Sequence, residues 1–180
     1  QVGMGRTGTL WGYEHLGVEP DIFTSAKGLG GGIPIGALLC KSFCDVFQPG
    51  DHASTFGGNP FVCKVALTVC ETLESENILT NVQQRGEQLR LGLQKLVDQN
   101  PQLLEQVRGW GLINGLVLKT DAPFKAVDIV KAAMNEGLLL VPAGPQVVRF
   151  VPPLIVNADE VHRALVATEK ALSSLKKQTE

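Results

Sequence analysis

Concentrated positive charge is scarce in this sequence. Sixteen Lys and Arg are offset by eighteen Asp and Glu among 180 residues, and the only compact basic run is Lys176–Lys177. A chain that binds nucleic acid or an anionic membrane usually carries a basic patch or stripe. We therefore expect neither nucleic acid nor a membrane surface among its partners.

Long uncharged hydrophobic runs are also missing. The stretch with the least charge, residues 22–40, contains Lys27 and several glycines, which is unlike a transmembrane helix or the apolar region of a signal peptide. No initiating methionine is present either, since the chain opens on Gln1 followed by Val2 and Gly3. This opening leads us to expect a cut within a longer protein.

Cysteine is sparse, and its spacing fits no familiar site. Cys40, Cys44, Cys63 and Cys70 form no C-x-x-C pair, and no histidine stands at metal-ligand spacing from them. A disulfide framework and a zinc site are therefore not expected. Cys63 and Cys70 lie seven residues apart in a predicted helix, where thiols commonly pack as small apolar groups. We predict that both belong to the core and that the compartment is reducing, which favours the cytoplasm.

Glycine, by contrast, is abundant in one region. Thirteen of the twenty glycines lie in the first sixty residues, which indicates backbone turned tightly against something that it must approach closely. The run GMGRTG at residues 3–8 matches the dinucleotide fingerprint G-x-G-x-x-G. That fingerprint has meaning only between a strand and a helix, and residues 9–13 are a poor helix start. We predict a glycine turn without a dinucleotide.

Apolar spacing and capping residues predict four helices, over residues 60–73, 78–97 and 126–136 and from Asn157 onward. Asn59 and Pro60 form a helix start, Glu160 is placed to complete a capping box with Asn157, and Gly137 stands where a left-handed cap is expected. Paired strands are predicted within residues 107–118, and short strands over residues 138–141 and 147–151. The second part of the chain thus reads as a small α+β unit.

Lys27 is the first candidate for chemistry. It is the only charged residue in residues 22–40, and it stands after a strand-like apolar run and before a series of glycines. Poor hydration would favour the neutral amine, which attacks a carbonyl carbon to form a Schiff base. The alternative is a lysine whose ammonium group simply reaches water. The residues alone leave both interpretations open.

Two other segments carry polar groups in suggestive places. Ser54 and Thr55 precede a glycine pair and a helix N-terminus, and hydroxyls with free N–H groups are the parts of phosphate sites. Taken alone, this segment is an ordinary loop and cap. Arg149 interrupts an apolar strand, where its guanidinium needs an anionic partner. A substrate carboxylate and an internal Asp or Glu would both satisfy it.

Several runs together resemble the class III pyridoxal-phosphate aminotransferases. They are GMGRTG at residues 3–8, PDIFTSAKGLGGGIPIGA at 20–37, STFGGNP at 54–60 and RFVPPL at 149–154. The resemblance implies an α/β protein with the pyridoxal-phosphate transferase fold of type I. Residues 1–75 would form the C-terminal part of the large mixed-sheet domain with the start of the interdomain helices, and residues 76–180 the small C-terminal α+β domain.

The resemblance also implies roles for single residues. Lys27 would hold pyridoxal phosphate as an internal aldimine and carry the transferred proton, while Gln1 would lie near the phenolic oxygen of the cofactor. Thr55 would bind the cofactor phosphate of the neighbouring subunit, Ser54 would lie near the substrate, and Arg149 would grip a substrate carboxylate. Active sites shared in this way imply a homodimer, and no metal is involved.

The implied reaction moves the terminal amine of N-acetylornithine to 2-oxoglutarate, a step of arginine biosynthesis in the cytoplasm. Related donors, namely succinylornithine, ornithine and 4-aminobutyrate, are alternatives. The family's aspartate for the pyridine nitrogen, its second phosphate loop and its ring-stacking aromatic are expected upstream of Gln1. An inactive fragment of such an enzyme is therefore a further alternative for the isolated chain.

Overall fold

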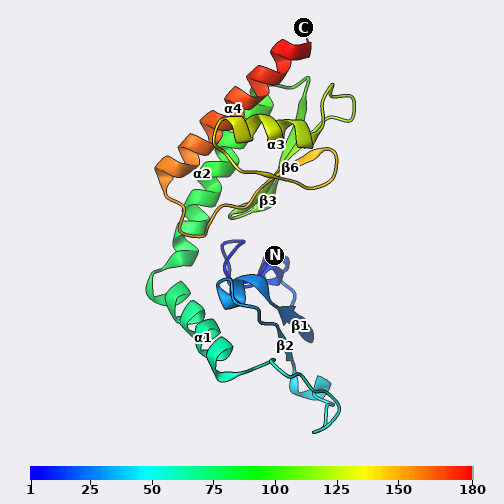
Figure 1. Ribbon diagram of the computed structural model, residues 1–180, viewed down its shortest axis with the longest axis vertical. Coiled ribbons are helices and arrows are strands. Elements are labelled where there is room, and N and C mark those ends of the chain that lie inside the picture. The colour runs from blue at the N-terminus through cyan, green and yellow to red at the C-terminus, as the bar shows by residue number, and fades with distance from the viewer. Residues whose placement is uncertain (180) are drawn as a thin grey trace. The chain divides into compact units, whose positions relative to one another are not determined.

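The computed structural model describes residues 1–179 and divides the chain into two compact units, Gln1–Leu79 and Thr80–Glu180 (Figure 1). The domain boundary expected from the sequence lies between residues 75 and 76. We describe each unit by itself.

The first unit contains a small antiparallel sheet and one long helix. Strand β1 (Ile22–Ser25) pairs with β2 (Ala37–Cys40), with Ile22 opposite Cys40 and Ser25 opposite Ala37. The unit also contains three short 3-10 helices, namely η1 (Gly12–Leu16) before β1, η2 (Lys27–Gly30) between the strands and η3 (Ser42–Cys44) after β2. The long helix is α1 (Pro60–Ser75). The strand pair thus brackets the segment that begins with Lys27.

Helix α1 begins where the sequence predicts. The side chain of Asn59 accepts a hydrogen bond of 3.1 Å from the backbone N–H of Val62, and Pro60 occupies the first turn. The buried stripe of the helix consists of Val62, Ala66 and Leu73.

The prediction that Cys63 and Cys70 belong to the core is wrong, because both thiols are exposed. Each residue turns an α-helix by about 100°, since about 3.6 residues complete a turn. Position 63 therefore lies about 100° from the buried Val62, and position 70 lies a similar step from Val69, which is half-buried.

The second unit is a four-stranded antiparallel sheet with helices. The strands are β3 (Leu104–Trp110), β4 (Ile113–Leu118), β5 (Val141–Pro142) and β6 (Val147–Phe150), in the spatial order β3-β4-β6-β5. The helices are α2 (Ile78–Gln99), α3 (Ala126–Asn135) and α4 (Ala158–Thr179). Helix α3 packs against α4, β5 and β6 (Figure 1). This architecture confirms the predicted small α+β unit.

The buried face of α2 and the start of α4 both agree with the predictions. In α2, the predicted residues are all buried: Ile78, Val82, Leu89, Leu93 and Leu96. Helix α4 opens on the predicted capping box, in which Glu160 accepts from the Asn157 N–H and Asn157 accepts from the Glu160 N–H, both at 2.9 Å.

The strand predicted over residues 138–141 is largely wrong, since β5 holds only Val141 and Pro142. Gly137 adopts the predicted left-handed conformation at φ 76° after α3. The N–H of Leu138 then donates to the Ala133 carbonyl at 2.9 Å, which closes the helix cap. The N–H of Leu138 therefore bonds to the end of the helix and not to a neighbouring strand.

None of the helices within residues 1–179 combines the length and the apolar content that crossing a lipid bilayer requires.

Candidate active site

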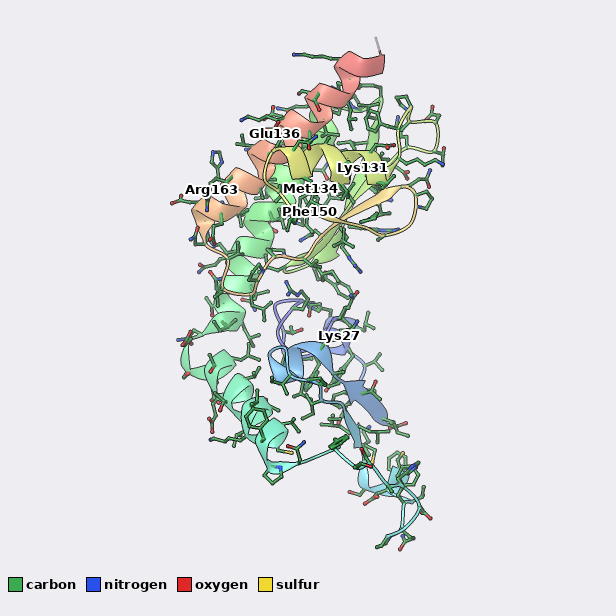
Figure 2. All side chains as sticks on the ribbon, viewed as in Figure 1. Lys27, Lys131, Met134, Glu136, Phe150 and Arg163 are labelled. Atoms are coloured by element: carbon green, nitrogen blue, oxygen red, sulfur yellow. The ribbon has the colours of Figure 1, made fainter. Side chains whose placement is uncertain are left out.

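Lys27 stands in a strained backbone conformation at a glycine-rich turn. It is the first residue of η2, directly after β1 and Ala26, and its φ is 52° (Figure 2). Left-handed backbone is uncommon for a residue with a long side chain, and such strain persists only where the surroundings maintain it. Because strained residues cluster at functional sites, this conformation marks Lys27 as a candidate for chemistry.

Of the two interpretations left open for Lys27, its exposure in this structure agrees with the one in which the ammonium group reaches water. Its neighbours in the turn include Gly28, Gly31 and Gly32, which have no side chains with which to bury an amine. Among residues 1–179, no carboxylate forms an ion pair with Lys27. The amine is therefore open to a reactive carbonyl group.

A shallow hollow adjoins this turn. Lys27 lines it together with Gly28 and residues 31–35, and its volume is about 360 Å³. Gly32 has a φ of 113°, and a side chain added there would meet no atom within 4 Å. An exposed primary amine beside an open glycine wall has the chemistry and the space to hold a planar carbonyl compound. Pyridoxal phosphate therefore fits the residues that are present.

The run at residues 3–8 forms the predicted glycine turn. The N–H of Gly5 donates to the Leu10 carbonyl at 3.1 Å, and the N–H of Gly8 donates to the Gly5 carbonyl at 3.0 Å. The element that follows is the short η1 rather than a long helix, so the geometry of a dinucleotide fingerprint does not form.

Met4 is a residue that the sequence analysis missed. It is 4% exposed, has a φ of 52°, and lies against Gly28, the neighbour of Lys27. The available signal was a bulky residue between Gly3 and Gly5, in a run where glycine would adopt the turn without strain.

Gln1 lies within electrostatic range of Lys27. The backbone nitrogen of Gln1 lies near the positive charges of Lys27 and Arg6. Burial lowers the pKa of the Arg6 guanidinium. The structure thus brings Gln1, Arg6 and Lys27 into one region of the first unit.

Ser54 and Thr55 lie on an exposed loop before α1. The Ser54 hydroxyl accepts a 2.9 Å hydrogen bond from the Gly57 N–H, and the Asn59 amide donates to the Phe56 carbonyl at 2.8 Å. These bonds fold the loop onto the start of the helix. Within the described part of the chain, no hydrogen bond joins Ser54 or Thr55 to Lys27.

Arg149 belongs to the second unit, where it occupies β6 opposite Gly115 of β4 and Val141 of β5. It is half-buried and lines a cavity of about 540 Å³ whose walls are mainly the apolar segments 138–141 and 150–156. Glu160 also lines this cavity, but its carboxylate is engaged in capping α4. A guanidinium beside an apolar wall is suited to binding a carboxylate with an aliphatic chain.

One side chain fixes the wall of this cavity. The side-chain amide of Asn81, on α2, donates to the Leu154 carbonyl at 2.8 Å and to the Val156 carbonyl at 3.0 Å. Both carbonyls belong to the segment that follows β6. Asn81 therefore ties this segment to the helix.

Comparison with known proteins gives a consistent result. The family model described as aminotransferase class-III matches residues 1–172. The chain is 72% identical over 175 residues to acetylornithine aminotransferase of Nostoc sp. and 70% identical to that of Thermosynechococcus vestitus. Each alignment covers 97% of this chain, but only 41% and 42% of the respective relative.

Solved structures agree with the sequence relatives. The crystal structure of acetylornithine aminotransferase from Elizabethkingia anophelis matches with a TM-score of 0.87 at 32% identity, over 97% of this chain and 46% of that one. An ornithine aminotransferase structure from Toxoplasma gondii, which shows partial occupancy of pyridoxal phosphate, matches with a TM-score of 0.91 at 32% identity. That match covers 100% of this chain and 43% of the other. These similarities confirm the predicted aminotransferase fold.

Proposed function

Because the chain belongs to the class III aminotransferase family, we propose that the protein transfers the terminal amine of N-acetylornithine to 2-oxoglutarate, with pyridoxal phosphate held by Lys27. The chain spans about 41% to 42% of the length of the two curated relatives named above, so the proposal concerns the full-length protein that contains it. The observation that carries the proposal is the exposed Lys27 in its strained turn.

Lys27 supplies the two functions that the reaction needs from this turn. Its Nζ can bond covalently to a carbonyl carbon, and after release it can carry a proton to and from the substrate carbon. Pyridoxal phosphate, when bound, supplies an electron sink for the carbon that loses its proton. The hollow beside Lys27 is open, so the Nζ of Lys27 would be accessible to a carbonyl compound.

The other residues would bind and orient. We assign Gln1 to the neighbourhood of the cofactor's phenolic oxygen, Thr55 to the phosphate, and Ser54 to the substrate region. The exposed position of Thr55 is compatible with contact to a cofactor in a neighbouring subunit, and the protein is accordingly proposed to be a homodimer with shared active sites. We place the reaction in arginine biosynthesis and in the cytoplasm.

The choice of amino donor can be tested directly. The two sequence relatives at 72% and 70% identity are both named for acetylornithine, which favours N-acetylornithine, whereas the solved structures named for acetylornithine and for ornithine are equally similar at 32%. The full-length enzyme should be assayed with 2-oxoglutarate and N-acetylornithine, succinylornithine, ornithine or 4-aminobutyrate in turn. The proposal requires the highest kcat/KM for N-acetylornithine. A higher kcat/KM for one of the other three donors would make that donor the substrate. Inactivity with all four donors would refute the proposed function.

Arg149→Lys in the full-length enzyme is expected to raise the KM for 2-oxoglutarate by roughly 10- to 100-fold, because a point charge cannot reproduce two parallel hydrogen bonds to a carboxylate. Cofactor binding should be unchanged, and steady-state kinetics with an absorbance check for cofactor would measure both. Arg108→Lys is the matched control, since Arg108 is an exposed arginine on the other side of Gly115 in the same row of the sheet. An unaltered KM in Arg149→Lys would indicate an internal partner for Arg149 instead.

Thr55→Ala should weaken retention of pyridoxal phosphate. Loss of one hydrogen bond to a charged phosphate corresponds to about 1.5 to 3 kcal/mol, or roughly a 10- to 150-fold rise in the dissociation constant. Fluorescence titration of the cofactor-free enzyme would measure it. Thr24→Ala, at an exposed threonine of β1, controls for loss of a surface hydroxyl. Equal affinities in Thr55→Ala and Thr24→Ala would remove Thr55 from the phosphate site.

A further inference from the structure

Three residues other than glycine have left-handed backbone in the described chain: Met4, Lys27 and Asn77, each with a φ of 52°. Asparagine tolerates this region, but unbranched long side chains seldom occupy it. The conformations of Met4 and Lys27 therefore depend on what surrounds them.

Met4 occupies a position where glycine would be the unstrained choice. It lies between Gly3 and Gly5, in a turn held by the hydrogen bonds from the Gly5 N–H to the Leu10 carbonyl, 3.1 Å, and from the Arg6 N–H to the Gly3 carbonyl, 3.3 Å. A side chain is useful here only for what it contacts. At 4% exposure, the burial of the methionine side chain can offset the strain of its backbone.

The contact that Met4 makes leads to Lys27. A Cβ added to Gly28 would stand 3.2 Å from the Met4 Cβ and 3.8 Å from the Met4 Cγ, so the methionine lies directly against the backbone that follows Lys27. Met4 also lines a cavity of about 520 Å³ together with Ser25 and Leu29, which flank Lys27 in sequence.

The turn at Lys27 is restrained by its own backbone and by helix α1, which packs against η2. Two backbone hydrogen bonds close it, from the Leu29 N–H to the Ala26 carbonyl and from the Gly31 N–H to the Gly28 carbonyl, both at 3.1 Å. Lys27 itself is exposed, and its side chain therefore contributes little packing. Helix α1 reaches the turn at Gly31, where Val69 lies close, whereas the residue beside Gly28, next to Lys27, is Met4.

We propose that Met4 is a positioning residue for Lys27, which holds the left-handed turn through its contact with Gly28 and so directs the amine. This inference rests on the proposed role of Lys27. Met4 touches neither substrate nor cofactor in this assignment, and it acts only through the backbone of residues 27–29.

The test compares three substitutions in the full-length enzyme. Met4→Ala removes the packing and keeps the backbone strain, Met4→Gly removes both, and Met4→Leu keeps most of the buried volume. Asn77→Ala is the control, because it alters the third left-handed position without touching the Lys27 turn. Hydrogen exchange of the Leu29 and Gly31 amides in the cofactor-free protein reports opening of the turn directly.

Met4→Ala and Met4→Gly should each speed exchange at Leu29 and Gly31 about tenfold, raise the dissociation constant of pyridoxal phosphate about tenfold, and lower kcat without a matching rise in donor KM. Met4→Leu should restore all three to within about threefold of the parent, and Asn77→Ala should leave the exchange of both amides unchanged. The proposal would be overturned if Met4→Ala kept the parent's amide exchange at Leu29 and Gly31 and its affinity for pyridoxal phosphate. It would also be overturned if Met4→Gly showed the parent values of both.

If Met4→Ala does not fold, Gly28→Ala tests the same contact from the other side. The added Cβ must push against Met4 at 3.2 Å, and faster exchange at Leu29 is again expected. Unchanged exchange and cofactor affinity in Gly28→Ala would refute the contact's role. Absence of a pyridoxyl group on Lys27 after borohydride reduction of the parent would refute the proposed function, while the exchange data would still decide the role of Met4.

Discussion

Lys27→Ala in the full-length enzyme is expected to abolish covalently held pyridoxal phosphate and to lower kcat by roughly 10³- to 10⁶-fold. The substitution removes both the group that bonds to the cofactor and the group that carries the proton. Borohydride reduction followed by peptide mass spectrometry should find a pyridoxyl group on Lys27 in the parent and on no residue of the variant. Single-turnover kinetics would measure the loss of the proton transfer.

Two further variants sharpen this experiment. Lys27→Arg keeps a positive charge but presents a guanidinium that is not deprotonated in proteins, so it should be as inactive as Lys27→Ala. Lys41→Ala is the matched control, since Lys41 is a half-buried lysine whose 3.1 Å ion pair with Asp21 lies at the far end of the same strand pair. Retention of reducible cofactor by Lys27→Ala would show that another residue holds it.

Gly86→Ala is expected to destabilise the protein by about 2 kcal/mol, although alanine is the better helix former by about 1 kcal/mol. A Cβ on Gly86, in α2, would stand 2.5 Å from the Gly111 carbonyl oxygen and 2.6 Å from its Cα. These are backbone atoms of the turn between β3 and β4, which cannot rotate away. The midpoint of urea unfolding, compared with that of the parent, would measure the effect.

Gly92→Ala serves as the control within the same helix. A Cβ there would meet the end of the Leu165 side chain, which is half-buried and can change rotamer. The clash and the gain in helix propensity should nearly cancel, so we expect a change within about 1 kcal/mol. Similar unfolding midpoints for Gly86→Ala and Gly92→Ala would mean that the β3–β4 turn yields more readily than its packing indicates.

The helix ends could be predicted from the sequence because their causes are local. Asn59, Asn157 and Gly137 each act on backbone groups within a few residues, and the structure places all three at helix ends as expected. The buried face of α2 follows from apolar spacing for the same reason.

Pairing between strands depends on distant partners and was harder to predict. Strand β2 lies in residues 37–40, an apolar stretch without alternation, and only its pairing with β1 across the glycine turn defines it. The brief β5 shows the converse case, since the apolar residues 138–140 lie outside it and the N–H of Leu138 bonds to the end of α3 instead.

The candidate site was predictable in composition but not in conformation. The isolated charge of Lys27 among apolar and glycine residues drew attention to it, yet its exposure depends on neighbours that only the fold assembles. The only sequence signal for the left-handed backbone of Met4 was its place between Gly3 and Gly5, and methionine rarely adopts that conformation. The roles of Gln1, Ser54, Thr55 and Arg149 stay predictions until the experiments above are done.

Asn81 gives the cavity beside Arg149 a particular chemical vulnerability. Two carbonyls, of Leu154 and Val156, depend on the hydrogens of one amide group. Aspartate has nearly the same shape but offers no N–H when ionised, and it would set a carboxylate against two carbonyl oxygens. Hydrolysis of this one amide would therefore release the cavity wall without any change in side-chain size, so the lifetime of the site depends on the chemical durability of Asn81.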